Sequence, residues 1–148
     1  MKYVDCTTLY MPFLCKMLGA YPTIYAQCVT CVDDKGKPLA GVLYDAYNGK
    51  SINAHIWVEV GETPSREWYA AIFDYPFNKL GVHKILGQVA GNNEEALRLD
   101  KHFGFVEEAR ILDYSDNGDL VLLTMTKDQC RVLNSPRWAK ITQRVEAA

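Results

Sequence analysis

The stretch GVHKILGQVAGNNEEALRLDKHFGF, residues 81–105, decides the fold of this chain. Residues 82–90 are largely apolar and predict a buried strand. Asn93 precedes a run of good helix formers, so we expect a helix over 93–103 with Asn93 as its N-cap. Gly104 ends that helix, and Phe105 anchors the start of another strand. A strand, a helix and a second strand in this order predict a sheet with a helix packed against it.

The rest of the chain extends this unit into a larger sheet. We expect a helix over 8–19, strands over 25–32, 39–47 and 51–60, a helix over 64–80, strands over 105–114 and 120–125, and a short helical stretch from 127. The connection from the third of these strands through a helix to strand 82–90 requires a right-handed parallel crossover. The order therefore predicts an α/β (α+β) fold with helices on both faces of a central mixed sheet. Residues 1–134 would form one domain, followed by a tail over 135–148.

Composition limits the possible functions. A chain of 148 residues suits one domain, and its net charge of −2 argues against general binding to nucleic acid. No run approaches the ~18 apolar residues of a membrane span. The first residues are interrupted by Asp5, Pro12 and Lys16, unlike a secretory leader. We expect a cytoplasmic monomer or homodimer.

Five cysteines, an odd number, fit a reducing compartment better than a disulfide framework. Cys28 and Cys31 form a C-x-x-C pattern within a predicted strand. Residues three apart on a strand point to opposite faces, and no second pair of ligands completes a zinc site. The pattern therefore favours core thiols and no metal.

Strict alternation marks the strand over 51–60, whose sequence is SINAHIWVEV with Gly61 following. His55 and Glu59 fall on its polar face, about 13 Å apart at ~3.3 Å per residue. One interpretation is an ordinary strand with a solvated second face. The other is that this face lines a cleft, since a central strand is otherwise apolar on both sides.

One motif spans the helix and the strand after it. The residues Asn93, Ala96, Leu99, Lys101, Gly104 and Phe105 stand at offsets 0, 3, 6, 8, 11 and 12. This spacing resembles N-x-x-A/S-x-x-L-x-K-x-x-G-F of GNAT-superfamily N-acetyltransferases, whose lysine usually stands one place later. The resemblance extends over roughly residues 25–127. The segment YAAIFDYPFNKLGVHK also resembles small phage and bacterial members, a branch similar to ribosomal-protein N-acetyltransferases.

The resemblance implies a GNAT-like fold, acetyl-CoA as co-substrate and transfer of an acetyl group to a primary amine of a protein or small molecule. It implies cofactor contacts from Trp57, Val58, Val60, Gly61, Ser65, Arg66, Asn93, Ala96 and Lys101. His55 or Glu59 would carry the proton away from the amine, directly or through water. Thr63 is expected to cap the helix after the loop, with Pro64 at its first position.

Two departures from the family keep an alternative function open. The family's loop motif Q/R-x-x-G-x-G/A is reduced to Gly61 and Arg66, and Glu62 adds a negative charge beside it. Many members carry a tyrosine seven residues after the motif asparagine, which acts as the acid toward the leaving thiolate. This chain has Asp100 at that position. An exposed aspartate has a pKa of about 3.9 and holds no proton at neutral pH, so we expect Asp100 to be solvated or to position the acceptor's ammonium. The alternative is a catalytically silent binding or assembly factor with the same fold.

Overall fold

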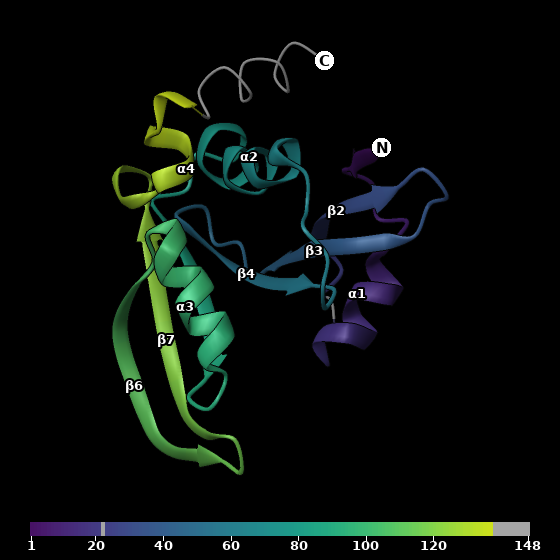
Figure 1. The fold of residues 1–148 in the computed structure, drawn as a ribbon. Coiled ribbons are helices and arrows are strands. Elements are labelled where there is room, and N and C mark those ends of the chain that lie inside the picture. Colours follow the sequence, from purple (N-terminus) through teal and green to yellow (C-terminus); the bar gives the residue numbers. More distant parts are fainter. Residues whose placement is uncertain (22, 138–148) are drawn as a thin grey trace.

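The computed structural model describes residues 1–21 and 23–137 and contains a seven-stranded sheet (Figure 1). The strands are β1 (Lys2–Asp5), β2 (Gln27–Asp33), β3 (Pro38–Asp45), β4 (Ser51–Val58), β5 (Lys84–Ala90), β6 (Val106–Ser115) and β7 (Gly118–Thr126). The helices are α1 (Met11–Leu18), α2 (Arg66–Asp74), α3 (Glu94–Phe103) and α4 (Arg131–Asn134), with a π-helix η1 (Tyr75–Lys79) and a 3-10 turn η2 (Lys127–Gln129).

The sheet order is β1-β2-β3-β4-β5-β7-β6. β4 and β5 run parallel, whereas the other neighbouring strands are antiparallel. The predicted mixed sheet is thereby confirmed. The prediction missed β1, a four-residue edge strand whose extended form depends on pairing with β2.

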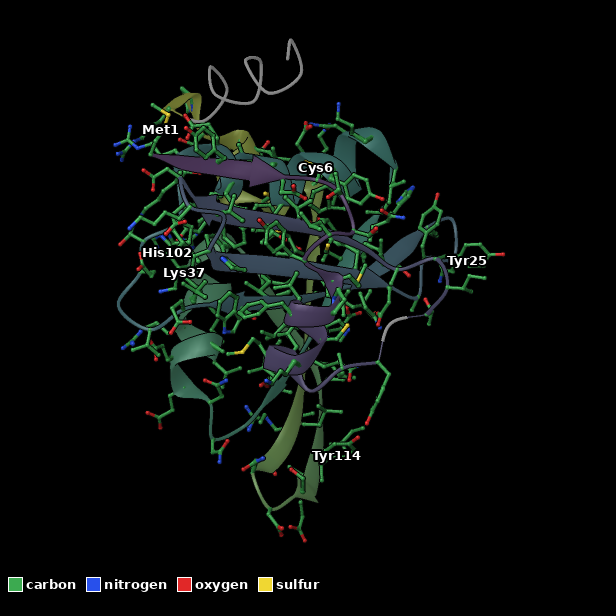
Figure 2. All side chains as sticks on the ribbon, turned by 90° about the vertical axis from the view of Figure 1, so that its right-hand side faces the viewer. Met1, Cys6, Tyr25, Lys37, His102 and Tyr114 are labelled. Carbon is green, nitrogen blue, oxygen red and sulfur yellow. The ribbon has the colours of Figure 1, made fainter. Side chains whose placement is uncertain are left out.

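Helices cover both faces of the sheet, as expected. Phe13 of α1 packs edge-on against Trp57 of β4, with ring centroids 5.2 Å apart, and α1 lies against β3 and β4. Figure 2 shows α1 in front of these strands and away from the β6–β7 hairpin, whose end carries Tyr114. The opposite face holds α2 and α3, which meet where Tyr69 and Phe73 pack against Phe103.

Two buried hydrogen bonds connect α2 to the sheet. The Trp68 indole donates to the Val29 carbonyl over 3.1 Å. The Tyr44 hydroxyl donates to the Ile72 carbonyl. Pro76 lies four residues after Ile72 and has no N–H for that carbonyl, so the tyrosine replaces the missing helical partner. The helix continues as η1, where the Leu80 N–H reaches the Tyr75 carbonyl.

The start of α2 differs from the prediction. Ser65, with φ −69° and ψ 155°, is the N-cap, and its hydroxyl accepts a hydrogen bond from the Trp68 N–H over 3.2 Å. Thr63 was the expected cap, and that prediction is wrong. Thr63 and Pro64 belong to the preceding loop, because the helix begins only where Trp68 can enter the core. At α3, by contrast, the predicted Asn93 cap is confirmed.

The prediction that Cys28 and Cys31 are core thiols is also confirmed. Cys28 and Cys31 are buried in β2, and the five cysteines are free. Among residues 1–21 and 23–137, no cluster of histidine, cysteine or carboxylate side chains could hold a metal ion. The same residues contain no helix long and apolar enough to cross a membrane. Most of the tail expected over 135–148 lies outside the described residues.

Replacing Gly104 with alanine should lower the free energy of unfolding by roughly 2–4 kcal/mol. Gly104 caps α3 with φ 114°, and an added Cβ would lie 1.9 Å from the Gln129 carbonyl oxygen. Gly81→Ala is the matched control, because Gly81 has φ 69° with nothing within 4 Å of such a Cβ. It should cost only about 1 kcal/mol. Urea denaturation measures both, and equal losses would contradict the predicted clash.

Candidate active site

A gap in the sheet forms the candidate site. β4 and β5 pair only at Ser51–Lys84, Ile52–Ile85 and Asn53–Leu86, and then separate. The Glu59 N–H donates to the Leu39 carbonyl, which fixes the alternation of hydrogen bonds between β4 and β3. The odd-numbered residues of β4 therefore bond to β3, and the N–H and C=O groups of Ile56 and Val58, which lie beyond the last pair with β5, face the gap. A central strand thus offers unpaired backbone groups to a ligand.

A cavity of about 660 Å³ occupies this gap. Its walls come from the end of α1, from β4 and the loop after it, from β5, from α2 and from the first turns of α3. Nine of the twelve site residues predicted from the sequence line it: His55, Trp57, Val58, Glu59, Val60, Gly61, Asn93, Ala96 and Asp100. The structure therefore brings most of the predicted site together.

The cavity lies beside the start of α3. The Asn93 side-chain oxygen accepts a hydrogen bond from the Ala96 N–H over 3.2 Å, which satisfies one of the N–H groups that have no partner within the first turn of the helix. The loop before α2 borders the same cavity at Gly61, whose φ of 80° favours glycine. Backbone N–H groups at helix starts attract anions, so this side of the cavity suits a phosphate.

The positively charged side chains predicted to contact the cofactor do not line the cavity. Arg66 and Lys101 are exposed, and within residues 1–21 and 23–137 no lysine or arginine lines the cavity. Lys2 of β1 instead reaches the loop before α2, where its ammonium donates to the Thr63 carbonyl and lies 3.9 Å from the Glu62 carboxylate. Lys2 therefore offsets part of the negative charge that Glu62 brings. The sequence offered no signal for it, because the contact joins the first strand to a loop about 60 residues away.

His55 is held by a neighbouring strand. Its Nε2 lies 3.2 Å from Oδ1 of Asp45 in β3, and both side chains are largely buried. This bond leaves Nδ1 as the other nitrogen for proton exchange. Glu59 lies just past the end of β4, where its carbonyl accepts from the Glu62 N–H in a turn. Both side chains line the cavity, which supports the cleft interpretation of the strand.

Asp100 corrects a prediction. The residue is only 7% exposed, so the expectation of a solvated helix residue is wrong. Burial raises the pKa of its carboxyl to about 7. Ala96, Leu99, Asp100 and Phe103 share the inner face of α3, a stripe at helical spacing that the sequence already contained. Which side of that stripe is covered depends on how α3 packs on β5.

Tyr69 of α2 was not predicted and also lines the cavity. Its ring packs edge-on against Trp68 and at a tilt against Phe103, with centroids 5.2 and 5.5 Å away. Burial and the Cys31 thiol raise the pKa of its hydroxyl, which stays protonated at neutral pH. The sequence signal was its place one residue after the buried Trp68, too common a pattern to single it out.

A second cavity of about 680 Å³ lies at the opposite ends of β4 and β5, on the side of the sheet that α1 leaves open. Its floor includes Leu86 and Leu122, and the Lys84–Glu108 ion pair of 3.0 Å crosses its wall. None of the residues predicted as functional lines it. We assign the site to the gap between β4 and β5, where unpaired backbone groups and a perturbed carboxyl converge.

Solved N-acetyltransferases share this architecture. Mutant forms of the spermidine/spermine N-acetyltransferase SpeG from Vibrio cholerae superpose with a TM-score of 0.71 at 18% identity, covering 92% of this chain and 99% of that one. A spermidine N-acetyltransferase from Vibrio cholerae in complex with CoA and spermine gives a TM-score of 0.69 at 16% identity over 86% of this chain and 96% of that one. A phosphinothricin N-acetyltransferase-like protein gives 0.60 at 13% identity over 85% and 98%. No protein-family model and no curated protein matches the sequence. The chain has the fold of the GNAT N-acetyltransferases, as predicted.

Proposed function

We propose that this protein transfers an acetyl group from acetyl-CoA to a primary amine. The observation that carries the proposal is the gap between β4 and β5, where the backbone groups of Ile56 and Val58 that face β5 have no strand partner in the described part of the chain. An extended pantetheine chain can complete the hydrogen bonding of such a strand, and an N–H there can stabilise the charge that develops on the thioester oxygen. The fold that this chain shares with the spermidine N-acetyltransferase solved with CoA supports this assignment.

The cofactor contacts follow from the same geometry. Val58 offers main-chain groups to pantetheine, whereas the register turns those of Trp57 toward β3. Val60, Gly61 and the Asn93–Ala96 turn border the path of the phosphates. Ser65 acts through its cap of α2, and Arg66 and Lys101 supply positive charge at exposed positions outside the cavity.

The acceptor must lose a proton as the new C–N bond forms. His55, oriented by Asp45, accepts it directly or through water, and Glu59 is the second candidate. Glu59, Glu62 and Glu95 also line the cavity and favour an amine that arrives as a cation. A polyamine fits this requirement, as does a lysine side chain or a protein amino terminus.

The test is calorimetric titration with acetyl-CoA, followed by assay of thiol release with spermidine, a lysine peptide and a peptide with a free amino terminus. We expect saturable binding and thiol release with at least one amine. A cavity without lysine or arginine among the described residues also suits a catalytically silent binding factor. Binding of acetyl-CoA without transfer would favour that alternative, and no binding at millimolar concentration would refute the enzyme.

A further inference from the structure

Gly87 lies in the middle of β5, and its surroundings give no structural reason for a glycine there. Its backbone does not need a positive φ, and a Cβ added there would meet no atom closer than 3.9 Å. Glycine weakens a strand interior, and it often marks a place where a ligand approaches closely. The fold would therefore accept alanine at this position, and the missing side chain leaves open space.

That open space connects a carboxyl to the cavity. The three atoms nearest to an added Cβ are Oδ2 of Asp100 at 3.9 Å, Cε1 of Phe105 at 3.9 Å and Cβ of Leu123 at 4.0 Å. Gly87, Asp100 and Phe105 all line the cavity. Glycine thus leaves the carboxyl oxygen accessible from the gap between β4 and β5, within a wall that is otherwise apolar at this point.

The described part of the chain gives the Asp100 carboxyl no fixed partner. Within residues 1–21 and 23–137, no hydrogen bond or ion pair reaches the Asp100 side chain. The other titratable groups that line the cavity are His55, Glu59 and Glu62 on one side, Tyr69 from α2, and Glu95 from α3. A buried carboxyl without a cationic partner is stable when neutral, and the neutral form is a proton donor.

From this arrangement we infer that Asp100 is the general acid for the departing thiolate, which it reaches through the open space beside Gly87. This inference rests on the proposed acetyl transfer. As the amine nitrogen bonds to the carbonyl carbon, the C–S bond breaks and its electron pair stays on sulfur. The sulfur takes the proton of Asp100. The base that has accepted the proton of the amine releases it to solvent, and solvent returns a proton to the carboxylate.

The direction of the pH dependence follows from the raised pKa. A pKa of about 7 means that Asp100 holds its proton below pH 7 and loses it above. The turnover number should therefore fall as pH rises through this range, once the supply of neutral amine is accounted for. The free energy of unfolding should also fall as pH rises, because the folded state binds one more proton than the unfolded state between about pH 4 and 7. Unfolding should become easier across that interval.

The experiment compares Asp100→Asn, Gly87→Ala and Tyr69→Phe with the wild type, using acetyl-CoA and an amine that the wild type acetylates. Asp100→Asn should lower kcat about tenfold to a hundredfold and leave the Kd for acetyl-CoA unchanged. It should also remove the decrease of kcat that the wild type shows as pH rises through about 7. The expected loss of kcat lies at the low end for acid catalysis because a thiol of pKa about 8.5 is a tolerable leaving group. Gly87→Ala, which keeps the carboxyl but covers it with a methyl group, should lower kcat less and also keep the Kd.

Four results would overturn the inference. Asp100→Asn could raise only the KM for the amine, which would assign Asp100 to acceptor binding. It could leave kcat within twofold of the wild type, or Tyr69→Phe could reproduce the loss in its place. A wild type that transfers no acetyl group to any amine would overturn the acid together with the proposed function. Denaturation between pH 4 and 8 checks the titration of Asp100 independently of activity. The free energy of unfolding of Asp100→Asn should lack the decrease with rising pH that the wild type shows.

Discussion

Replacing Ala96 with tryptophan should raise the Kd for acetyl-CoA at least about a hundredfold, a loss of roughly 2.7 kcal/mol. Ala96 lies in the first turn of α3 and lines the cavity between β4 and β5. An indole at this position would project into the cavity of ~660 Å³ and take up space that the pantetheine and phosphates need. Calorimetry measures the affinity, and thermal unfolding checks that the variant is folded.

Arg98→Trp is the matched control, because Arg98 lies on the same helix, is exposed and does not line the cavity. It introduces the same side chain into α3 and should bind acetyl-CoA within about twofold of the wild type. Normal affinity in Ala96→Trp would place the cofactor outside this cavity. A loss of affinity in both variants would indicate damage to α3 rather than a blocked site.

Replacing His55 with alanine should lower kcat by about 10²–10⁴-fold, the usual cost of a lost general base. His55 lines the cavity, and its bond of 3.2 Å to Asp45 fixes the ring. Asp45→Asn keeps the imidazole but weakens its orientation, so its effect should be smaller than that of His55→Ala. Steady-state kinetics at saturating acetyl-CoA measures kcat and the KM for the amine separately.

His83→Ala is the control for removing an imidazole, because His83 is exposed in the loop before β5 and lies outside this cavity. It should leave kcat unchanged. Glu59→Gln separates the two candidate bases, since a large loss there with a small one in His55→Ala would transfer the role to Glu59. If both variants stay within a few-fold of the wild type, neither residue is the base.

The sequence predicted most of the elements because each depends on neighbours along the chain. The alternation over 51–60 produced β4, and the asparagine before a helical run produced the cap of α3. Gly104 ends α3 as expected because its left-handed φ is a local requirement. β1 escaped prediction because four residues carry too short a pattern, and its pairing partner β2 lies more than 20 residues away.

The candidate site was predicted only in part. His55, Glu59, Asn93 and Ala96 line one cavity, and strand and helix periods already show which of these residues share a face. Arg66 and Lys101 were expected beside the cofactor but are exposed outside the cavity lining. Whether a long charged side chain on a helix turns inward depends on the elements packed around it, which a local pattern does not contain.

The sequence by itself determined the mixed sheet, its helices and the strand that borders the site, because hydrophobic periods and caps act over a few residues. Only the tertiary structure decided the state of Asp100, since its raised pKa comes from burial between α3 and β5. It also decided the pairing of His55 with Asp45 and that of Lys2 with the loop before α2. These properties depend on distances between elements, and desolvation and charge interactions act across such distances whatever the separation along the chain.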